Sequence, residues 1–112
     1  MNTIEGNKLI GEFCGWVEQD GLMCLQIDGA WWRIDLEDFK YHSSWDWLMP
    51  PYKKFNDMVV AEEIKHDMES SALHDALEVN ILKVNITEAH KCLSQLIQWY
   101  NNQTPTNKNN KV

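Results

Sequence analysis

The sequence has few cysteines, a shortage of positive charge and no long apolar run. The three cysteines, Cys14, Cys24 and Cys92, are far apart and form no CxxC pair. We therefore expect reduced core residues of a cytosolic protein, and neither a disulfide framework nor a zinc site. No apolar run approaches the ~18–20 residues of a membrane span, and the start of the chain lacks the pattern of a secretion signal. These absences predict a cytoplasmic protein with no membrane partner.

Basic residues are outnumbered by acidic ones. Lysine and arginine total 10 against 17 aspartates and glutamates, which gives a net charge of −7. Because phosphate backbones repel such a body, direct nucleic-acid binding is not expected. An acidic protein could instead occupy the nucleic-acid site of a basic protein, although a charge of this size is also an ordinary means of staying soluble.

Tryptophan, in contrast, is abundant, with 6 residues in a chain of 112. Indole rings bury large surfaces and are also favoured anchors at protein interfaces. The length suits one domain, which we place at residues 1–103, and the polar segment TPTNKNNKV predicts a disordered tail at residues 104–112.

The segment LMCLQI-DG-AWWRIDL predicts a β-hairpin, because Asp-Gly is a strong type I′ turn pair. With Asp28 and Gly29 as the loop, one face of the hairpin is apolar throughout. That face carries Met23, Leu25, Ile27, Ala30, Trp32 and Ile34. We therefore expect Trp32 in the core and Trp31 and Arg33 on the wetter face.

Helices are predicted on both sides of the hairpin. The predicted segments are residues 4–14, a turn at 44–49 that bends at Met-Pro-Pro into a helix at 52–67, and helices at 70–83 and 85–102. Three of these segments begin with a capping pair, namely Asn2 with Glu5, Ser43 with Asp46, and Asn85 with Glu88. Because an isolated hairpin is marginally stable, the sequence predicts an α+β fold with a hairpin or small antiparallel sheet covered by three to four helices, in a helix–sheet–helix sandwich.

The stretch YHSSWDWLMP brings a histidine, two serines and an aspartate close together in sequence. A Ser-His-Asp triad is defined by geometry and not by adjacency, and Ser43 and Asp46 already fit the role of helix caps. We therefore assign no catalytic residues.

The remaining histidines do not form a metal motif. His66 and His74 lie eight positions apart, but Ser70 and Ser71 are expected to interrupt a helix between them. No HExxH pattern is present, and His90 is isolated in sequence. We expect solvent-exposed histidines on helices, and we assign no metal-binding residues, cofactor-binding residues or cofactors.

Two tryptophans at the start of the central helix admit two interpretations. Trp45 and Trp47 point about 200° apart on a helix, so one packing layer cannot bury both. Either the tryptophans form an aromatic cluster that joins the helix ends, with the loop before the helix, or Trp16 and Trp99, closing over one of the pair, or some of them form an exposed patch for a protein partner. The candidates for such a patch are Trp31, Arg33, Trp45, Trp47, Tyr41 and Tyr52.

Three blocks occur in a familiar order: NKLIGEFCGW, YHSSWDWLMP and LIQWYN. Together they resemble small proteins of unknown function from phages and prophages of Bacteroidetes-type bacteria, and the order is similar to the phage-associated α-β-α sandwich domain. The chain departs from that pattern at residues 52–83, which read as helix where relatives look rich in strand. The resemblance implies a phage setting inside a bacterial host cell, and it supplies no catalytic residues.

The sequence thus favours a phage or prophage accessory protein that binds another protein, of host or phage, without catalysis. A symmetric homodimer through the aromatic patch is a further expectation. Two alternatives remain open. An acidic decoy predicts a continuous carboxylate face, and a small hydrolase or metal enzyme predicts a pocket that gathers histidines and carboxylates distant in sequence.

Overall fold

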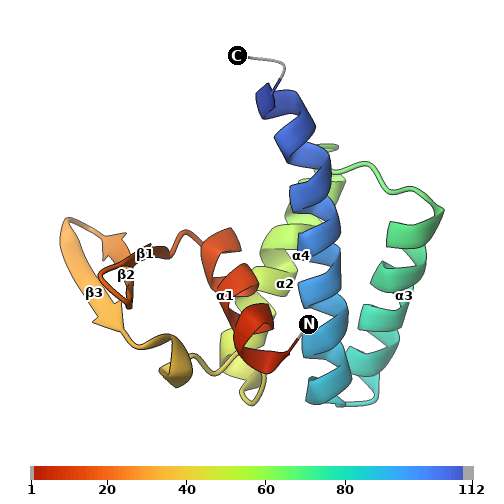
Figure 1. The fold of residues 1–112 in the computed structure, drawn as a ribbon. Coiled ribbons are helices and arrows are strands. Elements are labelled where there is room, and N and C mark those ends of the chain that lie inside the picture. Colours follow the sequence, from red (N-terminus) through yellow and green to blue (C-terminus); the bar gives the residue numbers. More distant parts are fainter. Residues whose placement is uncertain (1, 110–112) are drawn as a thin grey trace.

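The computed structural model describes residues 2–109, with side chains described as far as Gln103. It has an α+β fold, as predicted, with a three-stranded antiparallel sheet and four α-helices (Figure 1). The elements in chain order are α1 (Thr3–Phe13), β1 (Val17–Gln19), β2 (Leu22–Ile27), β3 (Ala30–Ile34), the 3₁₀ turn η1 (Leu36–Asp38), α2 (Trp45–Val60), α3 (Met68–Leu82) and α4 (Ile86–Asn109).

The predicted hairpin is confirmed in turn type and in register. Asp28 and Gly29 have φ angles of 51° and 83°, and a type I′ turn requires positive values at both positions. The paired residues are those of the prediction: Met23 with Ile34, Leu25 with Trp32, and Ile27 with Ala30.

The third strand, β1, was not predicted. It is joined to β2 by Asp20 and Gly21, which have φ angles of 53° and 80°. The sequence signal for this second turn was another Asp-Gly pair. It was missed because β1, the strand before it, is only three residues long.

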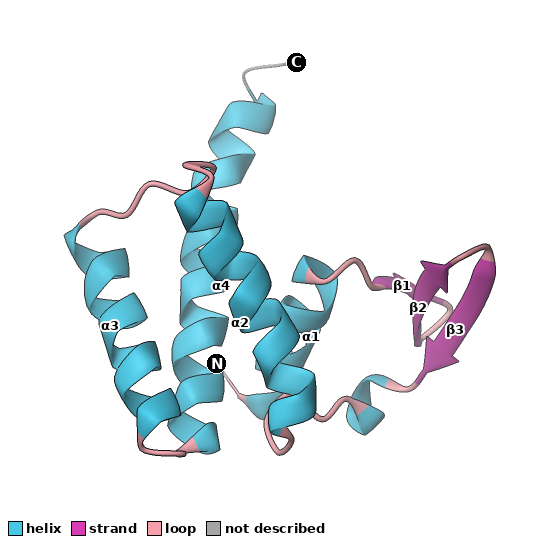
Figure 2. Cartoon of the chain, turned by 180° about the vertical axis from the view of Figure 1, so that it is seen from behind, coloured by secondary structure: helices cyan, strands magenta, loops and turns pink. Residues whose placement is uncertain are grey.

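The sheet lies beside the helices and is not enclosed by them (Figure 2). Only the end nearest the helices is buried, where Met23 and Cys24 are 1% and 2% exposed. The helical cover therefore does not extend over the whole apolar face, and Trp32 is exposed where a core position was expected. The helices pack mainly on one another, so the strand β3 receives little cover.

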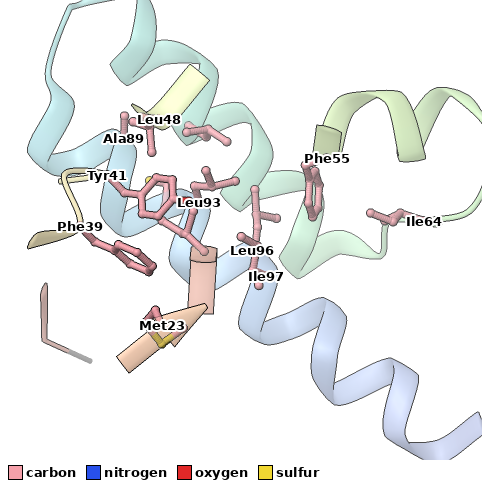
Figure 3. Close-up of a cluster of buried hydrophobic side chains, with 13 residues drawn as sticks. Met23, Phe39, Tyr41, Leu48, Phe55, Ile64, Ala89, Leu93, Leu96 and Ile97 are labelled. Atoms are coloured by element: carbon pink, nitrogen blue, oxygen red, sulfur yellow. The ribbon is translucent and has the colours of Figure 1, made fainter. Parts of the chain in front are cut away.

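The core forms where α1, α2 and α3 pack around α4 (Figure 3). Apolar residues recur along α4 at helical spacing, and Ala89, Leu93, Leu96 and Ile97 are all completely buried, as that pattern predicts. Burying each leucine or isoleucine contributes about 1.5–3 kcal/mol, so this face is the main source of stability.

The helix α2 is continuous from Trp45 to Val60, so the predicted bend is wrong, and the helix predicted at 52–67 begins and ends earlier than expected. Pro50 and Pro51 lie in its second turn, beyond the first turn that tolerates proline, so each removes a helical hydrogen bond and its ring crowds the carbonyl four residues earlier. Pro51 is fully buried, and this packing offsets the lost bonds. The N-cap residue is Ser44 and not Ser43, and its side chain makes no capping bond.

The ends of α2 and α3 depend on residues other than glycine in the left-handed conformation. Glu62 has a φ angle of 61°, and Val84 has one of 56°. After Val84, the amide of Asn85 donates to the carbonyl of Asn80 at 2.8 Å, which closes a Schellman motif. Because only glycine adopts this conformation cheaply, sequence reasoning extended α2 too far.

The remaining predicted helices are confirmed with shifted ends. The helix α3 starts two residues before the predicted Ser70, after a capping box that joins Asp67 and Ser70. In α4 the amide of Glu88 donates to the side chain of Asn85, as predicted. The backbone of α4 runs to Asn109, while the side chains of 104–109 and all of residues 110–112 lie outside the described part of the chain. Disorder of residues 104–112 stays a prediction.

No disulfide joins the three cysteines, all of which lie in the described part of the chain, and their reduced state stays a prediction. Cys24 and Cys92 are buried, and Cys14 is half-buried. Burial raises the pKa of the Cys14 and Cys92 thiols, so both are poor nucleophiles at neutral pH.

Candidate functional site

The most exposed aromatic side chains lie on β3. Trp31 is 56% exposed and Trp32 is 57% exposed, and as consecutive strand residues they point to opposite faces of the sheet. Ile27, at the end of the paired strand, is 48% exposed, and Arg33 is exposed beside them. We call these four residues the hairpin surface. It contains two of the six predicted partner-binding residues, Trp31 and Arg33, and it adds Trp32.

The other predicted residues lie elsewhere. Trp45 and Trp47 are half-buried in the first turn of α2, and Tyr52 is half-buried and donates its hydroxyl to Glu78 at 3.1 Å. Tyr41 is only 4% exposed, so it does not belong to an exposed patch. Burial also raises the pKa of its hydroxyl.

Tyr41 instead belongs to an aromatic cluster between the sheet and the helices. Its ring centroid lies 5.4 Å from that of Phe39 and 5.2 Å from that of Trp47, both in edge-on geometry. The Trp16 ring also packs edge-on against Phe39, with centroids 5.1 Å apart. The stretch YHSSWDWLMP contributes Tyr41 and Trp47 to this cluster, so these two residues have the structural role that one of the two interpretations predicted. Trp99 lies outside the cluster and stacks on His66.

A buried hydrogen-bond network centres on Asn7, which is 2% exposed. Its Nδ2 group donates to the carbonyl of Phe39 at 3.3 Å and lies 2.9 Å from Nδ1 of His42. Its Oδ1 atom lies 2.8 Å from Nε2 of His90. Three segments far apart in the sequence therefore converge on one amide, which links α1, the loop before α2, and α4.

These contacts determine where the histidine protons are. A backbone carbonyl can only accept, so the group of Asn7 that faces Phe39 must be the amide nitrogen. The oxygen then faces His90, and Nε2 of His90 must be the donor. By the same reasoning Nδ1 of His42 accepts, and its proton is carried on Nε2. Both rings therefore carry a proton on Nε2.

His90 is also electrostatically disfavoured as a cation. Burial, and secondarily the neighbouring His42, lower the pKa of His90 from 6.5 to about 4. The prediction of a solvent-exposed histidine is therefore wrong for His90, which is 6% exposed. Sequence reasoning missed the network because Asn7 and His90 are 83 positions apart.

A signal for the network was nevertheless present, since two glycines flank Asn7 within one helix. A Cβ atom at Gly6 would lie 2.7 Å from Oγ of Ser94 and 2.8 Å from Cε1 of His90. Glycine at this position permits α1 to approach α4 closely enough for the Asn7 bond.

A cavity of about 270 Å³ opens beside this network. Its walls are formed by Asn2, Thr3, His42, Thr87, His90, Lys91, Ser94 and Gln95. Both histidines of the network therefore contribute to a concave, polar site that no local sequence pattern indicated.

A second pair of histidines also converges, contrary to the expectation of separate, solvent-exposed side chains. The rings of His66 and His74 stack with centroids 5.0 Å apart. Ser70 does not break a helix but forms the capping box with Asp67 at the start of α3. Its hydroxyl lies 2.9 Å from Nδ1 of His66. Burial, followed by the interaction with His74, lowers the pKa of His66. Trp99 stacks on the same His66 ring, with centroids 6.0 Å apart.

Over residues 2–109, no group of three or more histidine, cysteine, aspartate or glutamate side chains is placed to hold a metal ion. In the same part of the chain, no helix combines the length and apolar character needed to cross a membrane. Comparison with protein families, with curated proteins and with solved structures finds no match to this chain.

Proposed function

We propose that this chain is a non-enzymatic protein-binding module that uses the hairpin surface. The observation that carries the proposal is the exposure of two adjacent tryptophans, Trp31 and Trp32, on a strand with little helical cover. Large apolar side chains grouped at a projecting element are typical of interaction sites and are unfavourable in water.

The exposed area of the two tryptophans is large enough to support a specific interface. With ~250 Å² for a whole tryptophan side chain, the exposed parts of Trp31 and Trp32 total roughly 280 Å². At ~25 cal/mol per Å², their complete burial would contribute about 7 kcal/mol before the costs of association. Micromolar binding corresponds to about 8 kcal/mol net, so the two tryptophans supply a large part of the required energy and main-chain hydrogen bonds and other contacts with the partner must supply the rest.

The position of β3 indicates how the partner binds. β3 is an edge strand, since the strand order is β1-β2-β3. The two tryptophans lie on opposite faces, so a surface that covered one face would reach only one of them. An extended segment added at the free edge of β3 would place alternate side chains next to both rings and would gain main-chain hydrogen bonds. The partner we infer is therefore a protein with an exposed, apolar extended segment, and a carboxylate in that segment would pair with Arg33.

The biological setting is proposed from the sequence. The three blocks that resemble phage and prophage proteins support an accessory role of this module in a bacterial host cell, where it would act in the cytoplasm. A host protein or a phage protein fits the partner described above equally well.

The test compares the wild-type protein with the double variant Trp31→Ala/Trp32→Ala in pull-downs from a bacterial host lysate. The matched control is Val60→Ala/Leu82→Ala, which removes two apolar side chains, each 83% exposed, from other elements. All three proteins are first compared in thermal unfolding, and sedimentation equilibrium reports whether a second copy is the partner.

A protein that binds wild type and control but not the tryptophan variant, and that contains an extended apolar segment, supports the proposal. Equal capture by all three proteins refutes it. Capture that survives the tryptophan changes and disappears at high salt would favour the acidic decoy instead.

A further inference from the structure

The cavity next to His90 differs in charge from the rest of the molecule. The chain carries a net charge of −7, yet none of the eight residues that line this cavity is acidic. Lys91 contributes an ammonium group, and the other linings are hydroxyl, amide and imidazole side chains. The lining is therefore polar and contains a lysine but no carboxylate, although Glu5 and Glu88 lie outside it in the first turns of α1 and α4.

The helix directions add to the positive charge of the lysine. The helices α1 and α4 pack together and run in the same direction, so both of their N-termini lie at the same end of the molecule (Figure 1). Thr3 and Thr87, from the first turns of these helices, both line the cavity. Each helix start carries roughly half a positive charge and amide groups without partners inside the helix, which Glu5 and Glu88 and the caps Asn2 and Asn85 offset only in part.

The tautomers of the network make the cavity rich in donors. Because Nδ1 of His42 is occupied by the Asn7 amide, the nitrogen left to His42 is Nε2, which carries a proton. The lysine, the two threonines and His42 can therefore all donate. His90, which is 6% exposed, also lines the cavity.

We propose that this cavity binds a small oxyanion, and specifically the phosphate group of a small phosphate ester. A volume of about 270 Å³ corresponds to about nine water molecules at ~30 Å³ each, so it holds a phosphate group and a short organic remainder. The site is separate from the hairpin surface, and the proposal does not depend on protein binding.

The test is a titration followed by two-dimensional amide NMR on the full chain. The probes are inorganic phosphate, glycerol 3-phosphate and acetate, each compared with sodium chloride at the same ionic strength. We expect the amide signals of Thr3, Thr87 and Lys91 to shift with the two phosphates and not with chloride. Acetate distinguishes a general carboxylate site from a phosphate site, and we expect it to bind more weakly.

Two variants alter the site without removing the core. Lys91→Gln removes the ammonium group, and we expect the affinity for phosphate to fall by about tenfold, the size expected for one charge-assisted contact. Thr87→Glu places a carboxylate at the start of α4, which favours the helix but repels an anion. We expect it to keep or raise the melting temperature and to abolish binding. Lys65→Gln, at an exposed lysine outside the cavity, is the control and should bind as wild type does.

Two results would overturn the proposal. One is amide shifts that are the same with phosphate and with chloride, because they would show screening alone. The other is phosphate binding that is unchanged in Lys91→Gln and in Thr87→Glu, because it would place the anion elsewhere on the molecule.

Discussion

Replacing Asn7 by alanine should cost more stability than any other single change to a polar side chain in this protein. The change leaves the buried Nε2–H of His90 without an acceptor and the carbonyl of Phe39 without its side-chain donor. Phe39 is completely buried, and His90 is 6% exposed, so water does not readily replace the lost partners. His42 is half-buried, and its nitrogen can recover a bond from water.

The magnitude follows from these two stranded groups. Each unsatisfied buried group costs about 1–3 kcal/mol, so the pair costs about 4 kcal/mol. Alanine is a better helix former than asparagine by roughly 0.6 kcal/mol, which reduces the loss slightly. We therefore expect Asn7→Ala to lower the free energy of unfolding by about 3–4 kcal/mol, a large part of the ~5–15 kcal/mol typical of a domain.

The assay is urea unfolding monitored by tryptophan fluorescence, with the midpoint and the slope fitted separately. The control is Asn56→Ala, which also removes an asparagine bonded to a histidine, His74, but at a half-buried position. We expect the control to lose about 1 kcal/mol. If the two variants lose the same amount, or if Asn7→Ala loses less than about 1 kcal/mol, the network does not hold α1 and α4 together as described.

Two further predictions concern α3 and acid stability. Val84 has a φ angle of 56° and is 70% exposed, so its side chain strains the backbone without contributing much packing. Val84→Gly should relieve about 1–2 kcal/mol of this strain, against a chain-entropy cost of about 0.5–1 kcal/mol. We therefore expect a higher melting temperature, and a lower one would contradict the strain argument. The pKa of His90 is about 4 in the folded protein and 6.5 for the ordinary side chain, so the unfolded chain binds the proton more readily. The neutral His90 ring therefore contributes its full stability above pH 6.5. This contribution is lost as the pH falls toward 4, by at most about 3 kcal/mol. Urea midpoints between these pH values should therefore fall less steeply in His90→Gln, and identical pH profiles would exclude His90 as the cause.

Sequence reasoning succeeded where a local rule is sufficient. The Asp28-Gly29 pair gives the turn its positive φ angles, and once the loop length is known the register of the hairpin follows. The apolar spacing along α4 likewise identifies its buried face. Sequence reasoning failed at α2 for two reasons. The left-handed residue that ends the helix is Glu62 and not a glycine, and the burial of Pro51 lets the helix continue through two prolines.

The candidate sites show the same difference between what local sequence rules predict and what tertiary packing decides. Trp31 and Arg33 are exposed, as expected, but Trp32 was assigned to the core because the sequence shows which residues share a face and not how far the helices extend over it. The histidines were expected to be separate and solvent-exposed, because nothing in the local sequence shows that Asn7 lies between His42 and His90.

The sequence by itself thus determined the fold class, the hairpin, most of the helices and an excess of aromatic side chains, because these depend on turn chemistry and on the spacing of neighbouring residues. Only the tertiary structure decided which tryptophans remain in water, and it alone brought His42, His90, Lys91 and two helix starts around one cavity. The physical reason is that burial and hydrogen bonding depend on which surfaces meet, and those surfaces come from segments far apart along the chain.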